Sequence, residues 1–547
     1  MEAIVVGEGY EWEALNPLLG FGGEGASKLF DGLIRHDATL KVVPALAAEV
    51  PAVAADGRSW TVTLRQGVRF HDGSAFDAED VVATYRAVLN PVFTSTVRSD
   101  FPMLTGIEKV DASTVRFELA YPYAPFANRL NLGIMPSEAL ATPAPLESSP
   151  FNSAPIGTGP YKLAEWRKGS TMTLAANEAY FDGAPPVKKI TVVFAEDDNT
   201  RAQQMRAGDL DATVLPPALA RTFEGGEFAV LHHRSADYRT VTMPSSHPVT
   251  GDPAIRKALN VAVNRQGMID ALLTGKGVAA STPVPAVLAS YVEPAAQFRH
   301  DPAEAVRILD AAGWVLGADG IRARNGQSAR FTLMYPATDT VRKDLAQAVV
   351  SDAKAVGIEV VLEGLGWEAI EPRLAQDSLV MGGGSQLDPD QVIYPLLHSS
   401  FGGDGFNNPG SYRNAEVDAG LEAARRATDP AQQIAAVKRW QRAYAADPGF
   451  VFLVFLDHSY VMRQKWNGYT PVVDPHSHGV LTWGRCGTSR TGHRGDDPAR
   501  SAGHRQRCRR PSMAGGRVAR AAPAGLRGAR AGGGRGGDLP AGCGVAV

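Results

Sequence analysis

Apolar and polar residues alternate most regularly between positions 56 and 82 of the chain. Trp60 and Val62 fall on one side of an extended segment with polar residues between them, a period of two that is typical of a strand with one buried face. A Gln-Gly turn follows, and we expect residues 68–70 to form the second strand of a hairpin. Asp77 is then placed to cap a helix. This stretch therefore predicts a hairpin that runs into a capped helix.

Two later segments have a strand–helix–strand pattern instead. In each, a short apolar run is followed by a longer helical run and by a second apolar run, which is the unit of a parallel sheet. The two units occupy residues 190–211 and 331–362. We expect the chain to pass between them at about 240–250 and again at about 460–470. Two lobes joined by two crossings predict a hinged α/β protein with a cleft that can close on a ligand.

Length and composition agree with a globular protein of two or three domains. The chain has 547 residues, of which 44% are apolar and 21% are charged, and it has no uninterrupted apolar run long enough to cross a bilayer. Its start, Met1-Glu2-Ala3, lacks the basic and apolar regions of a secretory signal, which taken alone favours the cytoplasm. A strand-like segment begins at Ala3, however, as if the sequence started inside a mature domain.

The composition changes abruptly after Gly484. Residues 485–547 contain thirteen Arg, no Lys, no Glu and no aromatic residue, together with all three cysteines of the chain. One interpretation is a basic tail that binds nucleic acid or anionic lipid. The other is translation of a GC-rich gene in a shifted frame, which the absence of Lys favours. We expect this segment to be disordered and to have no function.

Several ordered motifs resemble one family of proteins. Residues 56–82 read Asp-Gly-x-Ser-Trp-Thr-Val-x-Leu-Arg-x-Gly-Val-x-Phe-x-Asp-Gly, followed by Phe-x-Ala-Glu-Asp-Val; residues 155–161 read Pro-Ile-Gly-Thr-Gly-Pro-Tyr; and residues 208–211 read Gly-Asp-Leu-Asp. In this order the motifs are similar to those of the extracytoplasmic solute-binding proteins of family 5, which feed peptide, opine and nickel ABC importers. The resemblance extends over residues 3–484.

The resemblance implies the two-lobed fold of the periplasmic binding proteins, of the class with an extra inserted subdomain and two crossings between lobes. Together with the pattern above it predicts the following division. Lobe I comprises residues 1–35, 156–246 and a return segment at 466–484; the inserted subdomain is 36–155; lobe II is 247–465; and the tail is 485–547.

The sequence offers no recognised catalytic centre. It has no Gly-x-Ser-x-Gly elbow, no His-Glu-x-x-His and no complete phosphate loop, and no Cys precedes the tail. We interpret His232-His233 as polar residues near a strand, and His476 and His478 as part of a surface turn beside Pro475, rather than as metal ligands. We therefore expect a protein that is not an enzyme and that has no cofactor and no metal.

Candidate ligand-binding residues come from the resemblance and from departures within it. Glu24 lies in a Gly-rich loop that we expect to face the cleft, before a predicted helix over 26–33. Peptide-binding relatives carry an Asp where this chain has Ser385-Gln386-Leu387, so the resemblance does not supply a partner for a peptide amine. Asp388 is a candidate ligand contact: with Asp390 it forms either an acid pair or the cap of a following helix over 391–397. The eight candidates are Glu24, Arg98, Trp367, Ser385, Gln386, Asp388, Phe406 and Asn407. Among them Arg98 could pair with a carboxylate or be solvated, and Trp367, Phe406 and Asn407 could form a stacking wall or belong to the core and a turn.

These observations predict the substrate-binding component of an ABC importer. We expect a monomer, located in the periplasm or anchored at the cell surface, that binds a small peptide-like or metal-chelate ligand, delivers it to the permease subunits and does not bind nucleic acid. Two alternatives stay open: a cytoplasmic, hydrolase-like enzyme on a two-lobed α/β scaffold, and a non-functional frameshifted product.

Overall fold

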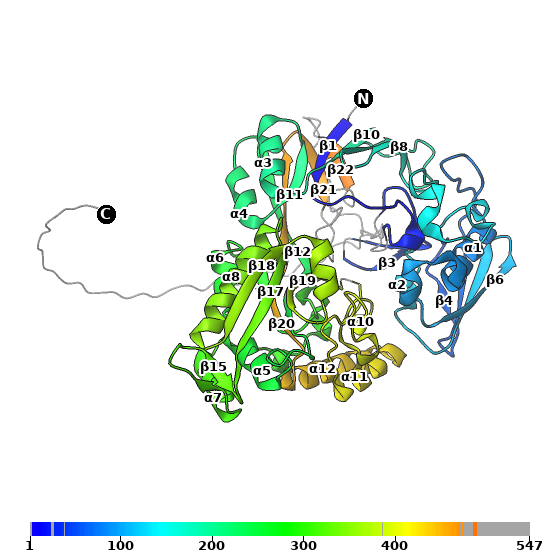
Figure 1. The fold of residues 1–547 in the computed structure, drawn as a ribbon. Coiled ribbons are helices and arrows are strands. Elements are labelled where there is room, and N and C mark those ends of the chain that lie inside the picture. Colours follow the sequence, from blue (N-terminus) through cyan, green and yellow to red (C-terminus); the bar gives the residue numbers. More distant parts are fainter. Residues whose placement is uncertain are drawn as a thin grey trace, which may run out of the picture. The chain divides into compact units, whose positions relative to one another are not determined.

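The structure is a computed structural model that describes residues 3–22, 27–37, 39–385, 387–470, 473 and 485–488. Eleven strands form one sheet with the order β18-β17-β19-β12-β20-β11-β1-β10-β9-β8, and β13 pairs with β20 as a branch. Two long antiparallel strands, β12 (Phe228–Thr242) and β20 (Phe450–Arg463), lie at its centre (Figure 1). Every other strand of this sheet belongs to one side of that central pair or the other.

The central pair forms both crossings between the lobes. Residues 228–234 of β12 pair with the second half of β20 in lobe I, and residues 238–242 pair with its first half in lobe II, with a bulge between Arg234 and Tyr238. The two predicted crossings are confirmed, but the chain changes lobe inside these strands, earlier than the predicted 240–250 and 460–470. Because main-chain pairing continues through the junction, each crossing is part of a strand and not a separate linker.

Lobe I contains the first predicted strand–helix–strand unit. Strand β1 (Ala3–Glu8) lies parallel between β10 (Lys189–Phe194) and β11 (Ala212–Leu215), and helix α3 (Asp198–Ala207) connects the latter two. The edge of the sheet is completed by antiparallel strands β9 (Thr171–Ala176) and β8 (Tyr161–Arg167).

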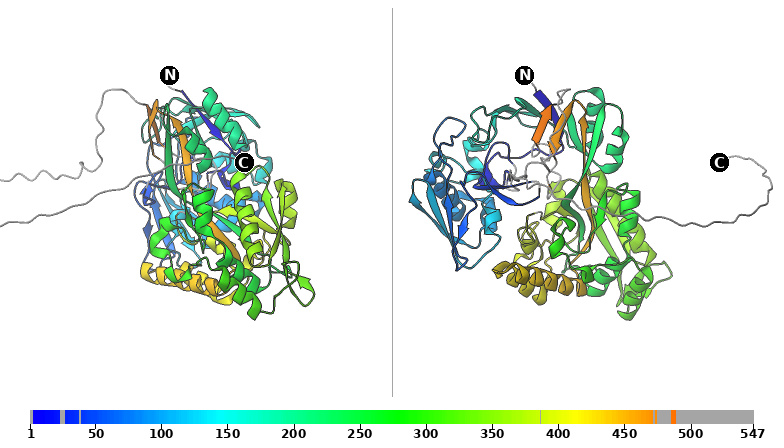
Figure 2. Two further views of the ribbon diagram at one scale, coloured as in Figure 1. Left: turned by 90° about the vertical axis from the view of Figure 1, so that its left-hand side faces the viewer. Right: turned by 180° about the vertical axis from the view of Figure 1, so that it is seen from behind.

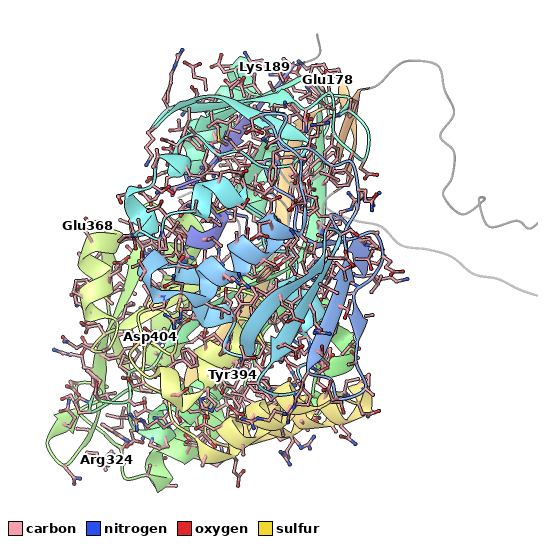
Figure 3. All side chains as sticks on the ribbon, turned by 90° about the vertical axis from the view of Figure 1, so that its right-hand side faces the viewer. Glu178, Lys189, Arg324, Glu368, Tyr394 and Asp404 are labelled. Carbon is pink, nitrogen blue, oxygen red and sulfur yellow. The ribbon has the colours of Figure 1, made fainter. Side chains whose placement is uncertain are left out.

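Lobe II contains the second unit. Strand β17 (Arg330–Pro336) lies parallel between β18 (Glu359–Leu365) and β19 (Ser378–Gly383), with α8 (Thr340–Ala355) connecting β17 to β18. Its other main elements are α5 (Pro253–Ala262), α6 (Arg265–Ala271), β13 (Gly277–Ala279), α7 (Pro302–Ala311), α11 (Ala415–Arg426) and α12 (Pro430–Ala446). Figure 2 shows α11 and α12 at the end of this lobe. In Figure 3, Arg324 of lobe II lies at the opposite end of the protein from Lys189 of lobe I.

Three lobe II helices begin with the same Asp-Pro device. Asp252, Asp301 and Asp429 each accept a backbone N–H of the first turn, and a proline occupies the next position. Proline is well suited there because its missing N–H would have no partner inside the helix. These starts could be predicted from sequence because cap and helix are neighbours in the chain.

The inserted subdomain has its own sheet. Its order is β4 (Ala52–Val53), β5 (Ser59–Thr63), β7 (Thr114–Leu119) and β6 (Leu104–Asp111), and helix α1 (Ala78–Leu89) packs against it. The helix cap predicted at Asp77 is confirmed, and Asp80 completes it as a capping box. The predicted hairpin is wrong: both edges of β5 are occupied by β4 and β7, so residues 68–70 have no free edge to pair with and form only one isolated bridge.

The predicted helix over 26–33 is also wrong for its described part, residues 27–33, which is not helical. The backbone carbonyls of Lys28 and Leu29 instead accept hydrogen bonds from Tyr161 and Gly159, at 2.9 and 3.0 Å. The backbone of Leu29 lies so close to Gly157 and Gly159 that neither position has room for a Cβ. The Gly-Thr-Gly motif is therefore explained by close backbone packing.

One hydrophobic core joins the inserted subdomain to lobe I. It includes Ile4 and Val6 of β1 together with Val62, Val115 and Phe117 of the insert, whereas lobe II contains two separate clusters. Contiguous buried side chains hold two elements in one arrangement. Lobe I and the insert therefore form one side of the cleft and lobe II forms the other.

The remaining elements are short. They are β2 (Ile34–His36), β3 (Val42–Pro44), α2 (Phe126–Arg129), α4 (Pro217–Ala220), β14 (Val315–Leu316), β15 (Arg322–Arg324), β16 (Gln327–Ser328), α9 (Trp367–Ile370), α10 (Ile393–Leu397), β21 (Trp466–Thr470) and β22 (Arg485–Thr488). In the described ranges, the loops between elements also contain ten short turns of 3-10 helix and one longer 3-10 stretch at Ala286–Tyr291.

Strand β22 lies in the segment that we expect to be disordered. It pairs antiparallel with β21, Trp466 opposite Thr488 and Thr470 opposite Arg485. The structure differs from the expectation at these four residues, because main-chain hydrogen bonds along a free strand edge need no particular side chains. The rest of the predicted tail lies outside the described residues. Within the described ranges, no helix has the length and apolar character needed to cross a bilayer.

Candidate ligand-binding cleft

A cavity of about 1150 Å³ lies between the two sides and is lined by both. Lobe I contributes the loop after β1, residues 9–13, and the residues that follow β11. Lobe II contributes the residues after β17 and the end of β19, and the central strands contribute Tyr238, Arg239 and residues 456–459. The cavity therefore lies where parallel strands end, which is the usual position of a ligand site in an open α/β sheet.

Aromatic side chains stand on both sides of this cavity. On lobe I, Tyr10 meets Trp12 edge-on with ring centroids 5.4 Å apart. On lobe II, Trp367 meets Phe406 edge-on at 5.8 Å. Trp367 and Phe406 are 40% and 44% exposed although both are large and apolar, and both line the cavity. Such a pair offers a ring or an apolar group of a ligand a surface to stack on.

Three buried arginines also line the cavity: Arg201 of α3, Arg239 of β12 and Arg342 of α8. Each is paired with a carboxylate two or three residues earlier, namely Asp198, Asp237 and Asp339 respectively. The Nε atoms of all three make no hydrogen bond within the described part of the chain. The cavity thus holds guanidinium groups that are neutralised by aspartates but only partly hydrogen-bonded.

The two sides approach each other at these ion pairs. Thr340 Oγ1 of lobe II donates a 3.2 Å hydrogen bond to Asp198 Oδ2 of lobe I. Burial raises the pKa of Asp198, an effect that Arg201 opposes and the nearby charge of Asp339 adds to. The carboxylates of Asp198 and Asp339 therefore face each other across the cleft. Their repulsion disfavours closure, so a positive charge added near them favours the closed arrangement.

The lining carries more negative than positive groups. Among the described residues, nine carboxylates line the cavity against one lysine and three arginines. Glu11 is fixed in place, since it accepts hydrogen bonds from the Trp166 Nε1 and the Gly169 N–H, both at 2.7 Å. A cleft of this charge attracts ligands that carry positive charge.

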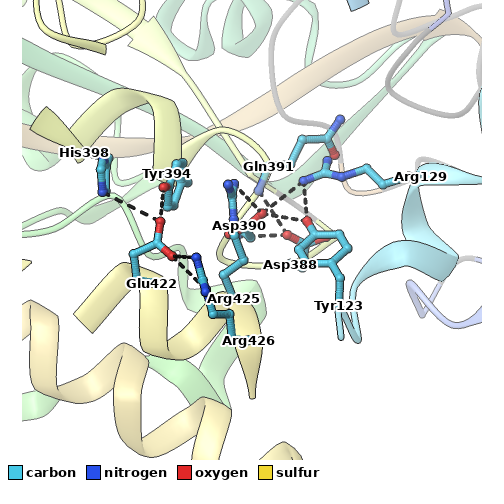
Figure 4. Close-up of polar contacts among 10 residues, drawn as sticks. All are labelled: Tyr123, Arg129, Asp388, Asp390, Gln391, Tyr394, His398, Glu422, Arg425 and Arg426. Atoms are coloured by element: carbon cyan, nitrogen blue, oxygen red, sulfur yellow. Dashed lines mark hydrogen bonds and ion pairs between the residues drawn. The ribbon is translucent and has the colours of Figure 1, made fainter. Parts of the chain in front are cut away.

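A second, buried contact between the sides surrounds Asp390 (Figure 4). Arg425 of α11 binds both oxygens of Asp390, at 2.9 and 3.0 Å, from within lobe II. From the inserted subdomain, Tyr123 Oη donates to Asp390 at 2.6 Å and Arg129 lies 3.3 Å away. Asn128 Nδ2 donates to Asp388 at 2.9 Å. This group of side chains, which we call the Asp390 cluster, links the insert directly to lobe II.

The structure places the predicted candidates differently. Trp367, Phe406 and Asn407 line the cavity. Ser385 and Asp388 are buried beside it; Asp388 caps the following turn by accepting the N–H groups of Asp390 and Gln391, as its alternative interpretation predicts. Arg98 is exposed and does not line the cavity, although Val97 and Asp100 do. Glu24 and Gln386 lie outside the described residues.

Sequence reasoning missed the three cavity arginines. Each follows its aspartate at a spacing that puts both on one side of the element, i+3 in a helix and i+2 in a strand, and this local signal could have identified the pairs. It could not have shown that they meet around one cavity. Within the described ranges, His, Cys, Asp and Glu side chains form no group of three that could hold a metal ion.

Comparison with known proteins gives consistent matches along the chain. Residues 41–404 match the family described as bacterial extracellular solute-binding proteins, family 5 Middle. Protein XP55 of Streptomyces lividans is 47% identical over 494 residues, which cover 90% of this chain and 91% of that protein. The oligopeptide-binding protein AppA of Bacillus subtilis is 30% identical over 455 residues, which cover 81% and 83%.

Solved structures agree. NikZ from Campylobacter jejuni, in complex with Ni(L-His), superposes with a TM-score of 0.81 at 26% identity and covers 88% of this chain and 98% of its own. AppA from Bacillus subtilis, in complex with a nonapeptide, gives 0.79 at 27% identity and covers 89% and 99%. The two-lobed fold expected from the sequence is therefore confirmed.

Proposed function

The chain belongs to family 5 of the bacterial extracellular solute-binding proteins, and we propose from this that it captures a small peptide-like or metal-chelate ligand in the cleft and presents it to the membrane subunits of an ABC importer. Members of the family bind solutes and are not catalytic. The enzymatic alternative raised by the sequence has no support from these relatives. Residence outside the cytoplasm, in the periplasm or at the cell surface, and a monomeric state are parts of the same proposal.

One observation carries it. The cavity is lined by two bodies that have separate hydrophobic cores and are joined through the two central strands. A ligand inside contacts both bodies only when they are closed, so binding shifts the population toward the closed form. A permease can distinguish that form from the open one by shape.

The size of the cavity supports a ligand larger than a single amino acid. Its volume of about 1150 Å³ is slightly above the roughly 300–1,000 Å³ of typical small-molecule pockets. We assign ligand contacts to Trp367, Phe406 and Asn407, which line the cavity. Ser385 and Asp388 lie in the loop beside it, and Arg98, Glu24 and Gln386 stay proposed contacts.

A thermal-shift experiment on the full chain tests the proposal. The ligands are di- to pentapeptides and nickel with L-histidine, each titrated over several decades. A ligand that binds only the folded protein raises the melting temperature steadily with the logarithm of its concentration. We expect this for at least one compound, and a smaller rise in the double variant Trp367→Ala, Phe406→Ala. Val315→Ala, at an exposed position of β14, is the matched control.

The proposal fails if no compound of either class shifts the transition. It also fails if mass spectrometry finds that a bound compound is chemically converted, because that would indicate an enzyme.

A further inference from the structure

Two of the cavity arginines, Arg239 and Arg342, meet on the lobe II wall. They reach the same place from different elements, the central strand β12 and the first turn of α8. A Cβ built on Gly382 would stand 2.6 Å from Arg239 Nη1 and 2.7 Å from Arg342 Nη2. These two nitrogens are therefore at most about 5.3 Å apart. Gly382 faces Arg239 in the pairing of β12 with β19, and only glycine leaves space for both guanidinium groups there.

Each of the two guanidinium groups is bound by its aspartate through only one of its nitrogens, Nη1. Asp237 binds Arg239 Nη1, which also donates to the Tyr238 carbonyl at 3.0 Å. Asp339 binds Arg342 Nη1 at 2.8 Å. The Nε atoms of both arginines have no hydrogen-bond partner among the described residues. Because a guanidinium has five N–H donors and a buried donor without a partner is destabilising, both groups have donors left for an acceptor.

Both side chains are nearly buried, at 2% and 7% exposure, and still line the cavity. Burial lowers the pKa of Arg342, and the positive charge of Arg239 lowers it further. The negative charge of Asp237 is shared, since His458 Nε2 also contacts it at 3.0 Å. The positive charges of the two arginines are thus incompletely compensated, and one more negative group bound beside them would be stabilising.

The geometry points to Arg239 and Arg342 as the subsite that binds an oxyanion of the ligand, a carboxylate in the case of a peptide-like molecule or chelate; this rests on the proposed function. Two adjacent guanidinium groups can present parallel N–H donors to the two oxygens of a carboxylate. The Trp367 ring stands beside the site, with its centroid 5.8 Å from Arg342 Cζ.

The rest of the cavity sets the ligand's orientation. Apart from these two arginines, the part of the lining that the structure describes carries nine carboxylates against Arg201 and Lys168. An anionic group placed away from the arginine pair, toward lobe I, would be repelled, whereas an ammonium group or a metal cation would be attracted there. The ligand therefore places its anionic end on lobe II and its positive or neutral end toward lobe I, with its middle between the aromatic pairs.

Malonate is the probe that tests the subsite without knowledge of the natural ligand. Melting temperature and Trp fluorescence of the full chain are measured against sodium malonate, with sodium chloride at equal ionic strength as reference. We expect a saturable rise and a fluorescence change for the unmodified protein. Both should be at least tenfold weaker in Arg239→Gln and in Arg342→Gln. The matched control is Arg330→Gln, an exposed arginine of the same lobe paired with Glu359.

Arg342→Lys provides a second variant if the glutamine variants fold poorly, because it keeps the positive charge but cannot present two parallel N–H donors. It should bind malonate with intermediate strength. The subsite is refuted if malonate acts no more strongly than chloride on the unmodified protein, or equally on all variants. Phosphate in place of malonate distinguishes the two oxyanion classes. We expect it to bind more weakly, and phosphate binding tighter than malonate overturns the assignment to carboxylates.

Failure of the subsite differs from failure of the proposed function. If peptides raise the melting temperature and their C-terminal amides do so equally, the receptor stands and the arginine subsite does not. If malonate binds through both arginines and no peptide or chelate binds, the subsite stands and the proposed ligand class does not.

Discussion

The hydroxyl of Tyr123 donates a 2.6 Å hydrogen bond to Asp390 Oδ2. The two residues are 267 positions apart, one on the inserted subdomain and the other on lobe II. Because the insert shares its core with lobe I, this bond joins the two sides of the cleft through two residues that do not themselves line the ligand cavity. The closed arrangement is therefore stabilised by the protein itself as well as by any ligand.

Tyr123→Phe should weaken closure more than it weakens folding. Asp390 keeps both bonds to Arg425 in the variant, so the lost bond counts mainly in the closed form, by about 1–2 kcal/mol. Ligand affinity should fall roughly 5- to 30-fold, measured by calorimetry with the best compound from the thermal-shift panel. Tyr291→Phe is the control, since its 2.9 Å bond to Gln433 lies within lobe II. Equal affinity losses in both variants would contradict the prediction.

Arg425 and Arg426 are neighbours in sequence with very different surroundings. Arg425 is buried, holds Asp390 and lies over the Tyr394 ring, whereas Arg426 is 60% exposed and pairs with Glu422. Arg425→Ala leaves a buried carboxylate with less compensation and should lower the free energy of unfolding by about 3–5 kcal/mol. Arg426→Ala should lower it by less than about 1 kcal/mol. Urea unfolding measures both, and similar values would refute the role given to the cluster.

Asp31 should make stability fall as pH rises. Tyr180 and Thr158 donate to its carboxylate at 2.9 and 3.0 Å, but burial dominates and raises the pKa of Asp31 to about 6. The folded state thus holds the proton up to higher pH than the unfolded chain, so this contribution is complete below about pH 4 and is lost as pH passes 6. Between pH 4 and 7, the free energy of unfolding of Asp31→Asn should therefore rise by about 2–3 kcal/mol relative to that of the unmodified protein. Urea unfolding at four pH values checks this; a constant difference would contradict it.

His71, which contacts the same Gly-Thr-Gly turn, should make stability fall as pH falls. Gly157 N–H donates to His71 Nδ1 at 3.3 Å and Nε2 lies 3.0 Å from the Gly159 carbonyl, which fits a neutral ring with its proton on Nε2. Burial lowers the pKa of His71 to about 4. Its contribution is complete above about pH 6.5 and is lost as pH falls toward 4. As pH falls from 7 to 4, the free energy of unfolding of His71→Gln should therefore rise by about 2–3 kcal/mol relative to that of the unmodified protein. Asp31→Asn should show the reverse trend and gain as pH rises.

Gly382→Ala should disrupt the arginine pair while the fold persists. The added Cβ would collide with Arg239 Nη1 and Arg342 Nη2, which are ends of flexible side chains and can move away. We expect malonate binding to weaken at least tenfold and the free energy of unfolding to change by about 1–3 kcal/mol. Gly106→Ala, where a Cβ meets nothing within 4 Å, is the control and should bind malonate normally. Undiminished binding in Gly382→Ala would show that the pair is not the site.

Local signals made part of the structure predictable. The helix starts at Asp252 and Asp301 can be predicted because cap and proline are adjacent in sequence, and a cap at Asp388 is one of the two alternatives that its sequence position allows. Residues 68–70 could not be placed, because their pairing depends on whether distant β7 takes the edge of β5. The arginine pair could not be predicted either. Its prediction would require the register that sets Arg239 opposite Gly382 and the parallel unit that brings Arg342 to the same strand end.

The ladder between β12 and β20 has a mechanical consequence. Two strands bonded along both halves have a preferred twist, so rotating one lobe against the other winds or unwinds them against an elastic resistance. Free linkers would offer no such restoring force. The resting angle of the cleft is thus encoded in this ribbon, and substitutions at its bulge can tune the ligand concentration at half occupancy from positions that no ligand ever touches.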